Sequence, residues 1–237
     1  MENDQETDHK QLTIDWGKLA VIFLCGRMGC GKSTAIESIV RNSAQNKVHD
    51  WVIAFTPTQY TGEFSYLPQN AVFEFGDGST LLKMYDQIQQ YKKRMASKNK
   101  KPKLSRGLCI ISDCMGSNSK LMNQLSFVNY FITTRHFGPI DLLIDGQRHT
   151  AVVPNVRQLA THVFIWKTSS PAQIKSLYQF AGGHCENHKE FRELLKRATA
   201  DPYFCLLYRK DAADPYMSFK FEPANEFQLK YTLPFRL

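Results

Sequence analysis

The sequence lacks any apolar run that approaches the roughly 20 residues needed for a membrane-crossing helix. Its first residues, MENDQETDHK, are polar and acid-rich, and they lack the basic-then-apolar order of a secretion signal. The 6 cysteines have no close, regular spacing, which argues against a disulfide framework and favours a reducing compartment. We therefore expect a soluble intracellular protein without a membrane segment.

One stretch of the sequence lacks acidic residues altogether. Residues 92–106, KKRMASKNKKPKLSR, contain eight Lys or Arg and no Asp or Glu. The whole chain has 30 basic and 22 acidic residues, a formal net charge of +8, so this stretch equals the entire excess. Such concentrated positive charge suggests a polyanion partner, most often nucleic acid. A solvated loop that only aids solubility is the alternative interpretation.

Short apolar segments alternate with helical patterns as far as residue 167. The apolar segments are typical of parallel strands that are covered on both faces, and they span residues 19–25, 51–55, 108–111, 141–144 and 162–166. Helices are expected near residues 32–44, 80–96, 120–133 and 156–160. This alternation predicts a layered α/β fold with a mainly parallel central sheet.

The pattern changes in the last part of the chain. Helices are expected there at residues 171–180 and 187–198, followed by edge strands at 203–208 and 217–221. We interpret residues 168–237 as a C-terminal α+β extension, with an antiparallel ribbon, of a single domain that spans residues 19–237 around a core at 19–167. Residues 1–18 form a polar N-terminal segment. Disorder is expected in the first dozen residues and in residues 92–106.

A glycine-rich octapeptide, GRMGCGKS at residues 26–33, fits the phosphate loop of P-loop nucleotide-binding proteins. Glycines permit the backbone turns that aim successive N–H groups at phosphate oxygens. Lys32 would reach the outer phosphates of ATP, and Ser33 would offer its hydroxyl to Mg²⁺. An expected strand before the loop and an expected helix after it support this interpretation. The residues expected to hold the nucleotide are Gly26, Arg27, Met28, Gly29, Cys30, Gly31, Lys32, Ser33 and Thr34.

A P-loop ATPase also needs an acid at the end of a second buried strand to hold the hydration shell of Mg²⁺. Asp113 follows an apolar run and Ser112, so we assign Asp113 to the metal; a helix-capping aspartate is the alternative, and the two roles can coexist. Many such ATPases have a second acid next, which activates the attacking water, but this chain has Cys114. The reverse assignment, with Ser112 at the magnesium position and Asp113 activating water, stays open.

Residues 141–147, DLLIDGQ, look like a further strand that ends in a polar residue. Gln147 would lie between the magnesium acid and the γ-phosphate, where its amide can donate to phosphate and accept from water. Arg157 and Arg135 lie near this strand in the sequence and are candidates for an arginine finger, which a neighbouring subunit can supply in ring ATPases. Each of them could instead be an exposed or salt-bridged arginine.

Taken in order, these motifs resemble the genome-packaging ATPases of double-stranded DNA viruses, the poxvirus-type branch of the FtsK–HerA superfamily of P-loop NTPases. The matching pieces are GRMGCGKST at 26–34, LCIISDCMG at 108–116, TTRHFGPIDLLIDGQRH at 133–149 and VPNVRQLATHVFIWK at 153–167. The resemblance implies a motor that hydrolyses ATP with Mg²⁺, assembles as a homo-oligomeric ring and moves double-stranded DNA into a preformed capsid. It also implies capsid or portal partners, and a location in the host cell (virus factory, cytoplasm or nucleus) or in the virion.

The same likeness implies a role for each matching residue. Lys32 and Ser33 would bind phosphate and magnesium, and Asp113 would be the magnesium acid. Gln147 would be the sensor, and Arg157, or else Arg135, would be the arginine finger. The family usually has a second acid where this chain has Cys114, which leaves the water-activating residue unassigned and is compatible with slow turnover.

The resemblance gives the basic stretch a role. A motor that grips DNA needs contacts to the phosphate backbone that ignore base sequence, and Lys and Arg clusters supply them. We expect a loop that projects from the core between residues 95 and 104. The residues expected to contact DNA are Lys92, Lys93, Arg94, Lys98, Lys100, Lys101, Lys103 and Arg106.

Three other functions are weighed against this one. A cellular or plasmid DNA-pumping ATPase is disfavoured by the short chain without a membrane segment. A nucleotide-gated DNA-binding module with weak or no hydrolysis is favoured by Cys114 at the water-activating position. A nucleotide or metabolite kinase would need an arginine-rich lid and an acceptor pocket, neither of which the sequence shows plainly.

Overall fold

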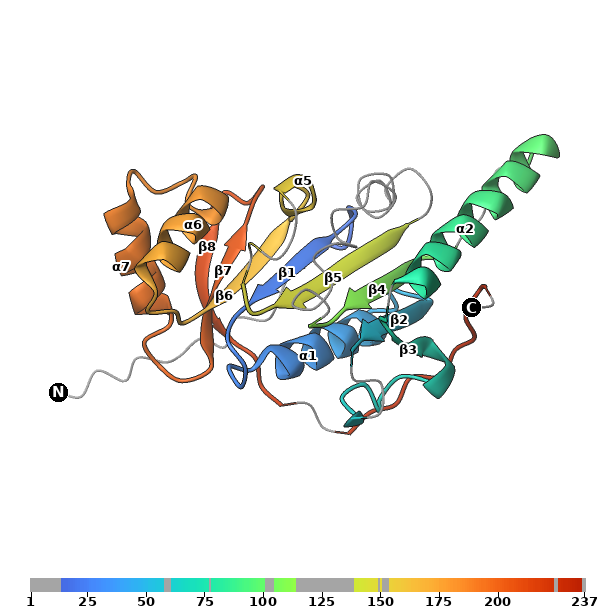
Figure 1. Ribbon diagram of the computed structural model, residues 1–237, viewed down its shortest axis with the longest axis horizontal. Helices are drawn as coiled ribbons and strands as arrows, with labels where there is room; N and C mark the ends of the chain where they lie inside the picture. The colour runs from blue at the N-terminus through green and yellow to red at the C-terminus, as the bar shows by residue number, and fades with distance from the viewer. Residues whose placement is uncertain are drawn as a thin grey trace.

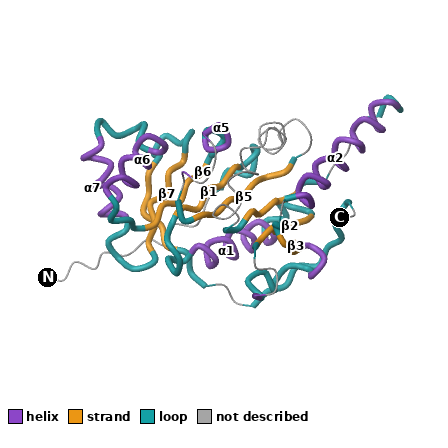
Figure 2. The backbone as a smooth tube through the Cα atoms, viewed as in Figure 1, coloured by secondary structure: helices purple, strands orange, loops and turns teal. Residues whose placement is uncertain are grey.

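The computed structural model describes residues 14–57, 61–76, 78–100, 105–113, 139–148, 150, 154–223 and 226–235. Within these residues an eight-stranded sheet forms the centre of the molecule, with helices on both faces (Figures 1 and 2). The strands are β1 Val21–Cys25, β2 Trp51–Thr56, β3 Val72–Glu74, β4 Gly107–Ile111, β5 Ile140–Gly146, β6 His162–Trp166, β7 Phe204–Arg209 and β8 Tyr216–Lys220. The helices are α1 Lys32–Gln45, η2 Gln69–Ala71, α2 Ser79–Ser97, α5 Pro154–Arg157, α6 Pro171–Ala181 and α7 His188–Ala198.

The strands lie in the order β3-β2-β4-β5-β1-β6-β7-β8. The first six of these are parallel to one another, and β7 and β8 continue the sheet in antiparallel fashion. Every residue of β1, β2, β4, β5 and β6 is buried. Strands covered on both faces need apolar residues throughout, so the sequence shows continuous apolar runs there instead of alternation. The expected α/β fold and the antiparallel ribbon of the extension are confirmed.

Two apolar layers hold the helices on the sheet. Helix α1 covers one face, where Ile36 and Ile39 share a cluster with Ile22 of β1. Helices α2, α5, α6 and α7 cover the other face, where Leu177 of α6 shares a cluster with Phe23 of β1. Full burial of one such side chain stabilises a fold by roughly 1.5–3 kcal/mol. Both faces of β1 are therefore fixed, and so is the position of its carboxyl end.

Residues 226–235 run from the β8 side of the molecule back to the opposite edge of the sheet (Figure 1). Phe227 stacks on Tyr66 with ring centroids 5.1 Å apart, and the N–H of Leu229 donates to the carbonyl of Tyr66 at 2.9 Å. The hydroxyl of Tyr231 donates to the carbonyl of Val52 in β2. This C-terminal segment therefore joins the extension to the segment that follows β2.

One expectation, disorder from residue 92 onward, needs correction, and one short strand was not predicted. Residues 92–97 belong to helix α2 and are ordered, because Leu81, Met84 and Ile88 recur at helical spacing and anchor the helix in the core. Strand β3 was not expected, since three residues are too few for a visible pattern. The helix expected at 120–133 lies outside the described residues. Within the described part of the chain, none of the helices has the length and apolar character needed to span a bilayer.

Candidate nucleotide site

The phosphate loop joins the carboxyl end of β1 to the amino end of α1. Gly29 and Gly31 have φ of 73° and 107°, backbone conformations that favour glycine. At Gly26 a Cβ would lie 3.0 Å from the Cβ of Trp166, so the backbone there has no room for a side chain. The first turn of α1, which is fully described, has no acid and no side-chain cap. Its free N–H groups and the positive end of the helix dipole therefore remain available to an anion.

The side chains of the loop differ in exposure. Gly26 is buried, while Arg27, Met28, Gly29 and Ser33 are exposed and the other loop residues are half-buried: Cys30, Gly31, Lys32 and Thr34. Burial raises the pKa of the Cys30 thiol above its ordinary value, which keeps it protonated beside the loop. The Nζ of Lys32 donates to the carbonyls of Gly26 and Arg27 at 2.9 and 3.2 Å. The ammonium group of Lys32 is therefore held over the backbone of the loop.

The edge of the sheet beside the loop carries two carboxylates, Asp113 and Asp145. In the sheet β5 lies between β1 and β4, with Leu24 of β1 opposite Asp145. Asp145 is 3% exposed, and its Oδ1 accepts a hydrogen bond from the N–H of Asp113 at 3.1 Å. Burial raises the pKa of Asp145 to about 6, although a hydrogen bond from Ser112 and the charge of Lys32 oppose the shift. Asp113 itself is exposed and has φ of 47°.

Gln147 comes directly after β5, the strand that lies between β1 and β4 in the sheet. It is exposed, and its carbonyl accepts from Nε2 of Gln173 in α6 at 3.3 Å. Gln147, Gly26 and Trp166 line one pocket of about 370 Å³. The structure thus brings the loop, Asp113 and Gln147 to the same carboxyl edge of the sheet.

Arg157 lies near the amino end of β1, whereas the phosphate loop follows its carboxyl end. Arg157 ends α5, and four residues later the N–H of Thr161 donates to the carbonyl of Val21, the first residue of β1. Figure 1 shows α5 away from the start of α1. Burial lowers the pKa of Arg157, and its Nε has no hydrogen-bond partner among the described residues. Arg135 and Cys114 lie outside the described residues.

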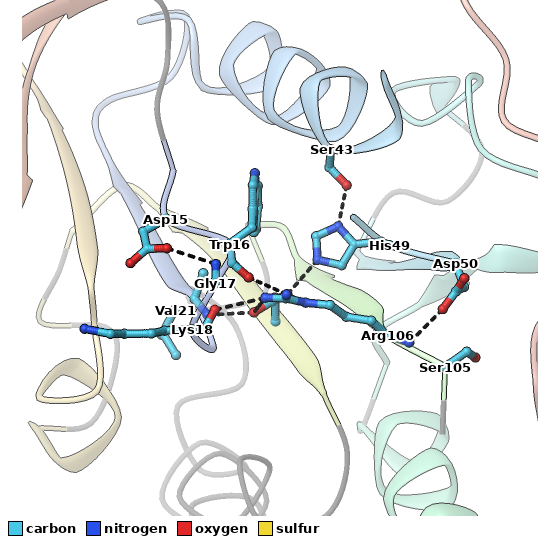
Figure 3. A network of polar contacts seen from close by, with 12 residues as sticks. Asp15, Trp16, Gly17, Lys18, Val21, Ser43, His49, Asp50, Ser105 and Arg106 are labelled. Atoms are coloured by element: carbon cyan, nitrogen blue, oxygen red, sulfur yellow. Dashed lines mark hydrogen bonds and ion pairs between the residues drawn. The ribbon is translucent and has the colours of Figure 1, made fainter. Parts of the chain in front are cut away.

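Arg106 differs from the sequence expectation that it contacts DNA. Its guanidinium donates to Asp141 at 2.7 and 3.1 Å, to the carbonyl of Lys18 at 2.9 Å and to the carbonyl of Trp16 (Figure 3). Asp141 is fully buried and also pairs with His49 at 2.6 Å. The charge of Arg106 is therefore neutralised inside the fold, where it ties the N-terminal segment to β5, and Arg106 leaves the set of candidate DNA contacts.

The outer half of helix α2 projects from the body of the molecule (Figure 1). Lys92, Lys93 and Arg94 lie in this half, and the other basic residues of the stretch come after the helix ends at Ser97. Lys93, Arg94, Lys98 and Lys100 are exposed, whereas Lys92 is half-buried and its pKa is lowered by burial. Residues 87–100 contain no acid. Lys101 and Lys103 lie outside the described residues. Of the loop expected between residues 95 and 104, residues 95–97 belong instead to helix α2, and residues 101–104 lie outside the described part of the chain.

Several residues near the loop had no assigned role from the sequence. The Oε1 of Glu63 accepts a hydrogen bond from the Oγ of Ser33 at 2.7 Å. Tyr203 is 60% exposed, and its carbonyl accepts from Nε1 of Trp166 at 3.3 Å; a Cβ on Gly31 would lie 3.7 Å from each of these rings. Among these missed residues and the carboxylates beside the loop, only Asp145 could have been noticed in the sequence, because it is a charged residue inside an apolar strand.

Comparison with known proteins supports the fold. No protein-family profile matches the chain. Uncharacterized protein 088R of Invertebrate iridescent virus 3 is 27% identical over 180 residues, which are 76% of this chain and 66%, just under two thirds, of that protein. The genome packaging NTPase B204 of Sulfolobus turreted icosahedral virus 2, solved with AMPPCP, matches 87% of this chain and 98% of its own at 15% identity, with a TM-score of 0.58. The chain has the fold of a viral genome-packaging NTPase.

The same fold is found in ATPases of other systems. The pCW3 conjugation coupling protein TcpA, solved with ATPγS, matches 88% of this chain and 62% of its own at 15% identity, with a TM-score of 0.62. EssC (ATPases 2 and 3) from Geobacillus thermodenitrificans matches 87% of this chain and 41% of its own at 15% identity, with a TM-score of 0.57. At the level of the fold, these neighbours confirm the resemblance drawn from the motifs.

Proposed function

We propose that the chain is an ATPase that uses Mg-ATP hydrolysis to move double-stranded viral DNA into a capsid. The observation that carries this proposal is the meeting of Lys32, Ser33, Asp113 and Gln147 at one edge of the sheet. The fold shared with the genome packaging NTPase B204 supports the choice of motor over other nucleotide-binding functions.

In this proposal the phosphate loop holds the triphosphate. Phosphate oxygens replace the carbonyls of Gly26 and Arg27 as acceptors for the Nζ of Lys32. The hydroxyl of Ser33 and the carboxylate of Asp113 are both exposed, and oxygen ligands of this kind suit Mg²⁺. The metal ion, when bound, neutralises part of the phosphate charge during transfer. Gln147, beside the loop, would sense the γ-phosphate.

The acid-free half of helix α2 would contact the DNA backbone. Its length places positive charge away from the nucleotide site, and contacts to phosphates need no base sequence. The contacting residues in the proposal are Lys92, Lys93, Arg94, Lys98, Lys100, Lys101 and Lys103.

A homo-oligomeric ring is the second part of the proposal. Arg157 lies at the edge of the sheet away from its own phosphate loop, so as an arginine finger it would serve the site of a neighbouring copy. Capsid or portal proteins would hold the ring at the site of DNA entry, inside the infected cell or in the virion.

The test is ATP hydrolysis by the purified protein with and without long double-stranded DNA, beside Lys32→Ala. We expect turnover that rises with DNA and is lost in the variant. ATP binding without phosphate release under either condition would contradict the motor. That result would favour a nucleotide-gated DNA-binding module, the second candidate, which Cys114 after Asp113 already favours.

A further inference from the structure

The loop after β2 brings an acid to the phosphate loop. Oε1 of Glu63 lies 2.7 Å from Oγ of Ser33, although the two residues are 30 positions apart in the sequence. Strand β2 is the neighbour of β4, with Phe55 opposite Ile111, and the N–H of Ser112 donates to the carbonyl of Phe55 at 2.9 Å. The chain leaving β2 therefore starts at the same edge of the sheet as Asp113.

The turn that carries Glu63 is fixed on both sides. Before it, Gly62 has φ of 75°, and its carbonyl accepts from the N–H of Ser65 at 3.1 Å. After it, Phe64 and Tyr66 are 4% and 7% exposed, and Tyr66 is held by the C-terminal segment 226–235. A carboxylate on a turn anchored in this way keeps its position relative to Ser33, which suits a catalytic role better than a side chain on a free loop.

Glu37 provides an internal comparison. It lies one turn after Ser33 on α1 and lines the same pocket as Glu63 and Tyr66. Within the described residues no hydrogen bond joins the carboxylate of Glu37 to the phosphate loop. Glu37 and Glu63 both line this pocket, but of the two only Glu63 has its carboxylate hydrogen-bonded to Ser33, a residue assigned to the phosphates and metal.

We propose that Glu63 activates the attacking water in ATP hydrolysis at this site, in place of the acid that is missing after Asp113. The proposal rests on the proposed function. When the hydroxyl of Ser33 turns to the metal, the carboxylate of Glu63 loses this donor and accepts a hydrogen bond from water instead. A water bound to Glu63 would lie next to Ser33, which is assigned to the metal and the phosphates.

The step conserves atoms and electrons. Glu63 takes a proton from the water as the water oxygen bonds to the γ-phosphorus. The bond between that phosphorus and the oxygen bridging to the β-phosphate breaks, and ADP leaves with the electron pair. The products are ADP and inorganic phosphate, and protonated Glu63 releases its proton to solvent.

The test compares Glu63→Gln with Glu37→Gln in the full-length protein. The amide of Glu63→Gln keeps the size of the side chain and an acceptor for Ser33, but it does not take a proton from water. We expect kcat for ATP to fall by about 100-fold or more, the scale of lost general base catalysis. The KM for ATP and the half-saturating Mg²⁺ concentration should stay within about twofold, and Glu37→Gln should match the wild type.

The other outcomes separate this inference from the proposed function. Wild-type kcat in Glu63→Gln overturns the role of Glu63 while leaving the ATPase intact. A kcat restored by excess Mg²⁺ also overturns it, because Glu63 would then be a metal ligand. A wild type that binds ATP without hydrolysing it contradicts the proposed function and this role with it. If Glu63→Gln fails to fold, Glu63→Asp gives the same test: a lowered kcat at unchanged KM supports the role, and an unchanged kcat overturns it.

Discussion

The N–H of Asp113 donates to Oδ1 of Asp145, 3.1 Å away, across the carboxyl ends of β4 and β5. Asp113 has φ of 47°, a conformation that costs a residue other than glycine on the order of 1 kcal/mol. The buried carboxyl of Asp145 therefore helps hold the turn that presents the exposed carboxylate of Asp113. Asp145, which is buried, thus positions Asp113, whose side chain is exposed to solvent.

The raised pKa of Asp145 predicts a pH-dependent stability. Burial raises this pKa to about 6, so between about pH 4 and 6 the unfolded chain loses its proton before the folded chain does. The contribution of Asp145 to the free energy of unfolding therefore falls across that window, and the penalty persists above it. We expect Asp145→Asn to be more stable than the wild type by roughly 1–3 kcal/mol at pH 7.5.

The measurement is urea unfolding of both proteins at pH 4.5 and 7.5. The difference in the free energy of unfolding between Asp145→Asn and the wild type should shrink as the pH falls from 6 towards 4. An advantage that is the same at both pH values would contradict the assignment of the effect to this carboxyl.

Replacing Asp141 by Asn should lower the free energy of unfolding, whereas Asp145→Asn should raise it. Burial alone would raise the pKa of Asp141, but hydrogen bonds from His49, Arg106 and the N–H of Ala20 outweigh it and hold the pKa below its ordinary value. The ionised carboxylate therefore stabilises the fold above the unfolded pKa and loses this effect as the pH falls through the lowered folded pKa. We expect Asp141→Asn to cost about 3 kcal/mol at pH 7, because Arg106 is left without its anion.

Urea unfolding at pH 7.5 measures this loss on the same scale as for Asp145→Asn. The two variants serve as controls for each other, since each replaces a buried aspartate of β5 by asparagine. A stabilised Asp141→Asn protein at neutral pH would contradict the buried network shown in Figure 3.

The basic stretch after Ser97 should set the salt dependence of DNA binding. Replacing Lys98, Lys100, Lys101 and Lys103 by alanine removes four charges, each of which would release about 0.9 counterions on meeting a phosphate. We expect weaker binding and a slope of log K against log salt that is shallower by up to about 3 to 4. Fluorescence anisotropy with a labelled duplex over a range of NaCl concentrations measures both.

Helix α7 supplies the matched control, because it carries four exposed basic residues: Lys189, Arg192, Lys196 and Arg197. It lies at the opposite end of the molecule from α2 (Figure 2). Replacing these four residues by alanine should leave the salt slope nearly unchanged. If both fourfold variants reduce the salt slope equally, DNA binding depends on the net charge of the protein and not on this stretch.

The place of Arg157 predicts complementation between subunits. Arg157→Ala and Lys32→Ala should each be inactive alone, because one lacks the finger and the other lacks the phosphate-binding lysine. In a mixed ring some interfaces pair an intact phosphate loop with an intact Arg157, so mixing the variants should restore measurable ATP turnover. A mixture as inactive as its components would contradict a finger supplied by the neighbouring copy.

The features that the sequence predicted are those with a local pattern. The phosphate loop is visible because its glycines and Lys32 are contiguous, and the buried strands are visible as apolar runs. Arg106 was misassigned because a run of charges is also a local pattern, whereas its partner Asp141 is 35 residues away. Glu63 had no pattern at all, since only the folded chain brings it to Ser33.

The C-terminal segment has a consequence for the order in which the site is completed during synthesis. Residues 226–235 hold Tyr66, and Tyr66 belongs to the turn that carries Glu63. The strands that support the phosphate loop, β1, β5 and β6, all leave the ribosome well before this segment does. In the proposed mechanism, a chain that is still being translated would therefore have its phosphate loop in place before the turn that positions Glu63.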